Sequence, residues 1–227
     1  MDTNLKEDMA INLSKVTLEK QGDSHKIDLT KGSSNSNKEI TINLNWTQKN
    51  KKNGFFSGHF GGTQSIDLDL GCFYLLNDGQ RSVIDGVQFG NGLGGPKDRL
   101  TKQGRYNGIP WIWHTGDDRS GAGGENILVN PAGLSDLKRI IIYCFIYDGI
   151  VKWEETNAVV TIKVSGNPDI VVEMGKQYNS KKFCAIADVL IDSKNSITVK
   201  KLVSFYNGHS DCDKAYNWGI NWTAGSK

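Results

Sequence analysis

Segments of strand length, separated by clusters of turn residues, run along the whole chain, and this pattern restricts the fold most strongly. Polar and apolar residues alternate in Glu39–Trp46, which predicts a strand with one face in water and one face in a core. Ile140–Ile146 is apolar without interruption and predicts a central strand buried on both faces. No segment carries an apolar helical stripe longer than about two turns. Pro131–Lys138 is at most a short helix.

The turn signals divide the chain into many short strands, and Asn77-Asp78-Gly79 is typical of a hairpin. Many short strands with regular turns predict an all-β fold, an antiparallel β-sandwich of two packed sheets. The predicted strands are Ala10–Leu13, Lys15–Glu19, Glu39–Trp46, Ser65–Leu76, Val83–Phe89, Ile109–Trp113, Asn126–Val129, Arg139–Tyr147, Ala158–Ser165, Asp169–Glu173, Lys182–Ile191, Ser196–Tyr206 and Tyr216–Trp222.

The length of 227 residues suits one sizeable β domain as well as two small ones, and it is sufficient for a single buried core. We expect a flexible N-terminal tail (1–8), one sandwich domain (9–222) and a C-terminal tail (223–227). Within the domain, Lys49–Thr63 forms a long loop rich in glycine and phenylalanine. The 27 basic residues are nearly balanced by 25 acidic ones, which argues against a nucleic-acid partner.

The cysteines and the N-terminal sequence indicate a reduced, cytoplasmic protein. The four cysteines are far apart without C-x-x-C spacing, and three of them lie in apolar runs. Residues 1–8 are polar and of mixed charge, unlike a signal peptide. The longest apolar run, Ile140–Tyr147, is too short for a transmembrane segment. Peripheral membrane association through the phenylalanine-rich loop stays open.

Two acidic segments are the main candidates for a binding site. Asp67 and Asp69 stand two residues apart, so in a strand they project from one face. The glycine-rich segment His114–Asn126 brings further carboxylates close to Arg119. Two unit charges about 4 Å apart cost roughly 4 kcal/mol at an effective dielectric constant of 20. A cation, an arginine or water must relieve that repulsion, and calcium prefers oxygen ligands of this kind.

Three ordered motifs, Ile66–Cys72, His114–Gly121 and Ile141–Gly149, strongly resemble the tellurium-resistance TerD family. The Trp46 region and Lys152–Thr156 are closer to its TerA-like branch. The resemblance implies a calcium-binding β-sandwich of a bacterial stress response, associated with resistance to tellurite, phage and colicins. It implies no enzymatic activity, and its expected partners are other stress-response and tellurite-resistance proteins.

The resemblance also implies which residues bind the metal. The segment Ser120–Gly124 lacks acids that many members of the family carry there, and fewer carboxylates mean fewer ligands. We therefore expect one calcium site, while a second site, or internal pairing of the acids by Arg119 without metal, stays open. The implied ligands are Asp67, Asp69, Asp117, Asp118 and Glu125, together with Asp148 after the long central strand.

Two other binding functions compete with this interpretation. Trp111, Trp113 and Trp153 are candidates for an aromatic platform that binds a carbohydrate or another small ligand. Alternatively, the chain is a metal-free assembly scaffold that docks through Lys49–Thr63.

Enzymatic interpretations have less support. His114 lies beside the acidic loop, but the sequence offers no nucleophile near it. Gly90–Gly95 matches G-x-G-x-x-G without a helix behind it or a βαβ pattern around it, so dinucleotide binding is not expected.

Overall fold

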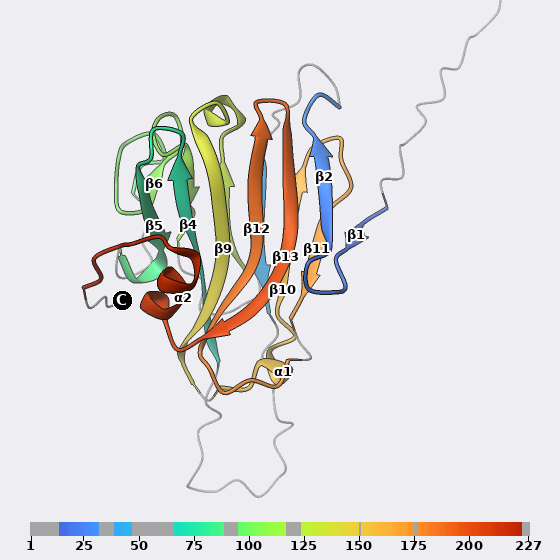
Figure 1. Ribbon diagram of the computed structural model, residues 1–227, viewed down its shortest axis with the longest axis vertical. Helices are drawn as coiled ribbons and strands as arrows, with labels where there is room; N and C mark the ends of the chain where they lie inside the picture. Colours follow the sequence, from blue (N-terminus) through green and yellow to red (C-terminus); the bar gives the residue numbers. More distant parts are fainter. Residues whose placement is uncertain are drawn as a thin grey trace, which may run out of the picture.

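The computed structural model describes residues 14–31, 39–46, 66–88, 95–116, 124–149, 151–174 and 177–223. Within these residues two β-sheets pack face to face, which confirms the predicted all-β sandwich (Figure 1). Neighbouring strands are antiparallel except at one edge, where β1 runs parallel to β11. The described helices are short, and the candidate site is built from strands of the two sheets.

The two sheets contain seven and six strands in the described part of the chain. In spatial order the first sheet consists of β1 (Val16–Thr17), β11 (Ile170–Glu173), β10 (Val159–Val164), β3 (Ile40–Asn45), β8 (Glu125–Val129), β7 (Ile112–His114) and β6 (Gly104–Arg105). The second consists of β2 (Ser24–Asp28), β13 (Ser196–Tyr206), β12 (Phe183–Ser193), β9 (Leu137–Asp148), β4 (Asp67–Leu76) and β5 (Arg81–Asp85). The α-helices are α1 (Trp153–Thr156) and α2 (His209–Tyr216), with 3-10 turns at Gly86–Gln88 and Pro131–Gly133.

Strand β9 shows why the core has two parts. Alternate residues from Ile140 to Ile146 face the main core between the sheets, whereas Ile141, Tyr143 and Phe145 face the other side of the six-stranded sheet. Helix α2 and the segment after it cover that other side (Figure 1). The prediction of a central strand buried on both faces is therefore confirmed. We call the second group the outer cluster: Phe73, Val83, Ile141, Tyr143, Phe145, Phe183, Ala185, Cys212 and Trp218.

Three local predictions were wrong or incomplete. The strand expected at Tyr216–Trp222 does not form, because Tyr216 ends α2 and Asn217 caps the helix in the left-handed conformation. The strand β2 was not predicted, since Ser24–Asp28 is mostly polar and pairs at the edge of its sheet. Only Pro131–Gly133 forms a turn of 3-10 helix, and β9 begins at Leu137.

All four cysteines are buried free thiols. No helix among the described residues is long and apolar enough to cross a membrane. The expected tail at 1–8, the strand Ala10–Leu13 and the loop Lys49–Thr63 lie outside the described residues, as do residues 224–227.

Candidate functional site

The candidate site is built around the first residues of β4. Strand β5 pairs with β4 only from Gly71 to Leu75, so Asp67–Leu70 extends beyond the end of its neighbour. On its other side this segment pairs with the last residues of β9. Backbone groups that leave a ladder inside a protein need other hydrogen-bond partners. The two partners of Leu70 come from the opposite sheet.

Glu125 and His114 provide those partners. The N–H group of Leu70 donates to Oε2 of Glu125 at 2.6 Å, and Nε2 of His114 lies 3.1 Å from the carbonyl oxygen of Leu70. Both side chains are fully buried. Glu125 begins β8 and His114 ends β7, so two strands of the seven-stranded sheet hold one strand of the other sheet by its backbone.

The contacts of His114 also determine its tautomer. A carbonyl oxygen only accepts, so Nε2 carries the proton that is donated to Leu70. The N–H group of Gly116 donates to Nδ1 at 3.1 Å, so Nδ1 acts as an acceptor. Each ring nitrogen thus has a backbone partner. The imidazole orients the start of β4 and the chain leading toward residue 117.

Asp67, Asp69 and Asp148 place three carboxylates at this end of the sandwich, which also carries α1 (lower end of Figure 1). Asp67 is the direct cross-strand partner of Asp148, with a register shift between Asp67 and Leu68. Asp69 is fully buried, whereas Asp148 is exposed and its Oδ1 accepts from Gly149 N–H at 2.8 Å. Like charges in opposed cross-strand positions repel each other. A cation between them would remove that repulsion.

The thiol of Cys144 relates two of these acids to each other. Burial raises its pKa above the usual range, and the carboxylates of Glu125 and Asp69 raise the pKa further. Glu125 of β8 and Asp69 of β4 therefore both influence the pKa of the Cys144 thiol. The fold brings Asp67, Asp69, Glu125 and Asp148 to one end of the molecule.

The other two implied ligands, Asp117 and Asp118, lie outside the described residues, as does Arg119. Among the residues that are described, no group of three or more His, Cys, Asp and Glu side chains is arranged to hold a metal. In chemical type, the carboxylates at the start of β4 and the end of β9 match a hard cation such as calcium. One oxygen of Glu125 is already used by the N–H group of Leu70.

The tryptophans proposed as an aromatic platform serve the packing instead. Trp153 is fully buried in the main core, where its Nε1 donates to the carbonyl oxygen of Lys181 at 2.8 Å. Trp113 is also buried. Trp111 donates from Nε1 to Asp136 at 2.8 Å and packs on Gly133, where a Cβ atom would overlap its ring. Their positions do not support the carbohydrate-binding alternative.

The buried carboxylate of Asp85 was not predicted from the sequence. Its Oδ2 accepts from the hydroxyl of Tyr143 at 2.6 Å and from Nε2 of His209 at 2.9 Å. The rings of Phe145, Phe183 and Trp222 lie around the imidazole, with centroids about 5 Å away. These contacts connect α2 to the six-stranded sheet. The sequence showed only a histidine three residues from Cys212, which carries no information about Asp85.

No protein-family model matches the chain. The chain is 35% identical to the "Tellurium resistance protein TerA" of an Alcaligenes species over 96% of its own length and 60% of that relative. It is 30% identical to the "Tellurium resistance protein TerX" of Serratia marcescens over 48% of its length and 54% of the relative. The chain therefore spans somewhat more than half the length of these relatives.

Two solved structures share the fold. A homologue of the telluride resistance protein TerD from Streptomyces coelicolor superposes with a TM-score of 0.50 at 15% identity, over 78% of this chain and 95% of its own. The protein SAV2460, described as of unknown function, gives a TM-score of 0.50 at 13% identity, over 75% of this chain and 91% of its own. These two structures show the same fold, and the sequence similarity to the TerA protein confirms the resemblance expected from the three motifs.

Proposed function

Since this chain is a relative of the tellurium resistance proteins, we propose that it is a non-enzymatic calcium-binding protein of a bacterial stress response. In this proposal it contributes to resistance against tellurite and acts together with other proteins of the same response. The observation that carries the proposal is the convergence of carboxylates at the start of β4. Asp67 faces Asp148 across the ladder, and the carboxylates of Asp69 and Glu125 both raise the pKa of the Cys144 thiol.

We assign two roles to the residues at this site. Asp67, Asp69 and Asp148 supply carboxylate oxygens, and Asp117 and Asp118 complete the set from the glycine-rich segment. Glu125 and His114 position β4, because they bind the N–H and the carbonyl group of Leu70. Calcium, when bound, supplies positive charge that relieves the repulsion between the carboxylates.

Metal binding of this kind stabilises the folded chain and orders the site. A ligand present at a hundred times its Kd stabilises a protein by about 2.7 kcal/mol if it binds only the folded state. A partner that recognises the ordered acidic segment would then bind the calcium-loaded protein more tightly. This linkage gives the calcium site a regulatory role.

The contacts of His114 favour a binding protein over a hydrolase. A general base needs a free ring nitrogen within reach of the proton it removes. Both nitrogens of His114 have backbone partners, and the side chain is fully buried. The histidine beside the acidic segment therefore serves the architecture of the site.

Calorimetric titration of calcium into chelator-treated protein tests the proposal. We expect saturable heat with calcium, little with magnesium, and loss of the heat in Asp67→Asn and in Asp117→Ala/Asp118→Ala. Asp192→Asn is the matched control, because this carboxylate lies in the β12–β13 hairpin at the other end of the sandwich. Absence of heat at millimolar calcium would contradict the proposal and favour the metal-free scaffold. The fitted stoichiometry distinguishes one calcium ion from two.

A further inference from the structure

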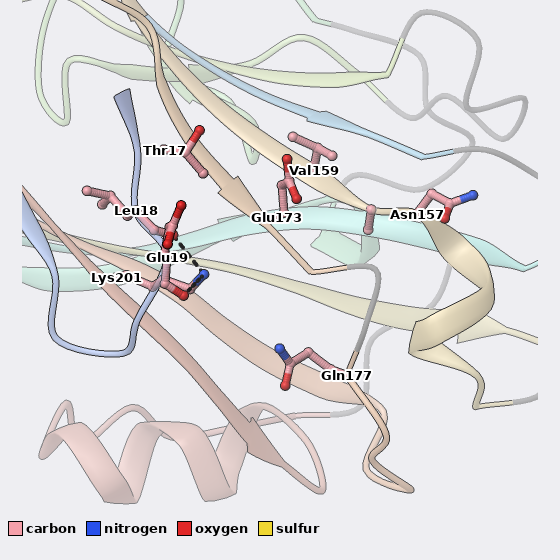
Figure 2. Close-up of a pocket in the computed structure, with 9 residues that line it drawn as sticks. Thr17, Leu18, Glu19, Asn157, Val159, Glu173, Gln177 and Lys201 are labelled. Carbon is pink, nitrogen blue, oxygen red and sulfur yellow. Dashed lines mark hydrogen bonds between the residues drawn. The ribbon is translucent and has the colours of Figure 1, made fainter. Parts of the chain in front are cut away.

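A cavity of about 490 Å³ opens on the side of the sandwich away from the outer cluster, at the edge where β1 ends (Figure 2). One wall comes from the seven-stranded sheet and the turn after α1, and the other from β13 of the six-stranded sheet. Small-molecule sites typically have volumes of roughly 300–1,000 Å³. The lining consists of Thr17, Leu18, Glu19, Asn157, Ala158, Val159, Glu173, Gln177 and Lys201.

Lys201 forms the buried wall of this cavity. Its Nζ donates to the carbonyl oxygens of Leu18 at 2.8 Å and Glu19 at 3.0 Å, which Figure 2 shows as dashed lines. Its backbone also bonds to Gly22 and Asp23. Burial lowers the pKa of the ammonium group below its ordinary value. Three nearby carboxylates, those of Asp23, Glu173 and Glu19, offset part of this lowering. Among the described lining residues the one positive charge is that of Lys201, and it is occupied in holding the chain after β1.

The other charged side chains among the described lining residues are the exposed carboxylates of Glu19 and Glu173. The amides of Asn157 and Gln177 also line the cavity, and Leu18, Ala158 and Val159 are its apolar residues. Described residues here offer no cluster of three metal-ligating side chains, and a single ion would fill little of the volume.

From these features we propose that the cavity binds a compact organic amine. Its ammonium group lies between the carboxylates of Glu19 and Glu173, its carbon chain contacts the apolar part of the lining, and the amide oxygens of Asn157 and Gln177 accept from further N–H groups. The cavity is formed by β1, β10, β11 and β13, none of which contributes a proposed calcium ligand. The inference is therefore independent of the calcium site.

Calorimetry with 1,4-diaminobutane as the probe tests this inference, and butane-1,4-diol is the matched neutral compound. We expect saturable binding of the diamine that weakens as salt is added, and no binding of the diol. Absence of saturable heat at about 10 mM diamine, or equal binding of the diol, would overturn the inference. Binding of butyrate in place of the diamine would also overturn it, because the ligand would then be an anion held by Lys201.

Two sets of variants locate the binding. Glu173→Gln keeps the size of an exposed side chain, and we expect it to weaken diamine binding about tenfold or more without changing the urea midpoint. The Asp192→Asn control and the calcium-site variant Asp117→Ala/Asp118→Ala are expected to bind the diamine as the native chain does. Unchanged affinity in Glu173→Gln would overturn the assignment to this cavity. Loss of affinity in the calcium-site variant would place the amine at the acidic end instead.

Discussion

In the part of the chain that the structure describes, two histidines pair with a buried carboxylate, and the two pairs serve different purposes. Glu125 and His114 lie between the sheets, 3.7 Å apart and fully buried, and each binds the backbone of Leu70. Asp85 and His209 lie on the outer face of the six-stranded sheet, 2.9 Å apart, where the histidine is partly exposed. The first pair provides hydrogen-bond partners for Leu70 of β4 beyond the point where pairing with β5 ends. The second pair attaches α2 to the six-stranded sheet.

The difference shows how the same residue types are used at different levels of structure. At the acidic end the side chains satisfy backbone groups, so the pair determines the geometry of the candidate metal site. In the outer cluster the carboxylate is shared by Tyr143 and His209, which come from distant parts of the chain. Removing each carboxylate should therefore have different consequences.

The largest expected effect comes from breaking the outer pair. Asp85→Ala leaves the buried hydroxyl of Tyr143 without its acceptor and removes the partner of His209, so we expect a loss of about 4 kcal/mol in the free energy of unfolding. Calcium binding should persist at the temperature where the variant is folded. Urea denaturation followed by tryptophan fluorescence measures the loss. Asp85→Asn retains an acceptor and should lose less; an equal loss would contradict this account.

The corresponding change at the acidic end is Glu125→Ala. It leaves the buried N–H of Leu70 unsatisfied, and we expect a loss of about 3 kcal/mol together with weaker calcium binding. Amide hydrogen exchange at Leu70 should become faster while exchange in α2 is unaffected. Glu125→Gln is the matched control, because its amide oxygen still accepts from Leu70. If Glu125→Ala left both stability and calcium affinity unchanged, the positioning role would be wrong.

The carboxylate of each pair acts on a buried thiol of the main core, which allows a comparison by pH. Burial raises the pKa of Cys72, near Asp85, and of Cys144, near Glu125 and Asp69, above the ordinary value of 9.0. Above that pH the unfolded thiols lose protons that the folded ones keep, so stability falls as pH rises. The slope is about 1.4 kcal/mol per pH unit for each thiol.

Urea midpoints measured from pH 8 to about 10.5 test this pH dependence. We expect the slope to become smaller by a similar amount in Cys72→Ala and in Cys144→Ala. Each substitution also causes a loss of packing, but this loss is the same at every pH. It therefore lowers all midpoints of a variant equally and does not change the slope. A slope identical to that of the native chain in either variant would contradict the assignment for that thiol.

The smallest effect is expected from Asp148→Asn. Without calcium it removes repulsion with Asp67 across the ladder and should stabilise the chain by roughly 0.5 kcal/mol. With calcium present it should weaken metal binding, so the stabilising effect of calcium becomes smaller. Denaturation in the presence of chelator measures the stabilisation without calcium, and denaturation in the presence of calcium measures how much of the stabilising effect of the metal is lost. Destabilisation in chelator would show that the two carboxylates do not repel each other.

Strand prediction succeeded where the local pattern was strong. Ser196–Tyr206 was predicted with the bounds that β13 has, and the uninterrupted apolar run of β9 correctly indicated a strand buried on both faces. Prediction failed for α2, because His209–Tyr216 carries few apolar residues and depends on contacts of Cys212 and its neighbours with the outer cluster. Polar β2 exists because it pairs with β13.

The candidate site also has some features that the sequence predicted and others that it did not. The spacing of Asp67 and Asp69 and the order of the motifs indicated an acidic end of a sandwich, because both are local properties. The pairing of Asp67 with Asp148 depends on a register shift between two strands far apart in sequence. The inward contact of Glu125 with Leu70 depends on where β5 ends.

The sequence by itself determined that this chain is a β-sandwich, which strands are buried and which segments carry the acids. Side-chain alternation decides these properties, since it acts over a few neighbouring residues. Only the tertiary structure decided that Glu125 and His114 bind Leu70, that Asp85 joins Tyr143 to His209, and that Lys201 forms the wall of a cavity. Each of these contacts joins residues from separate strands or helices, so sheet register and sheet packing determine which groups meet.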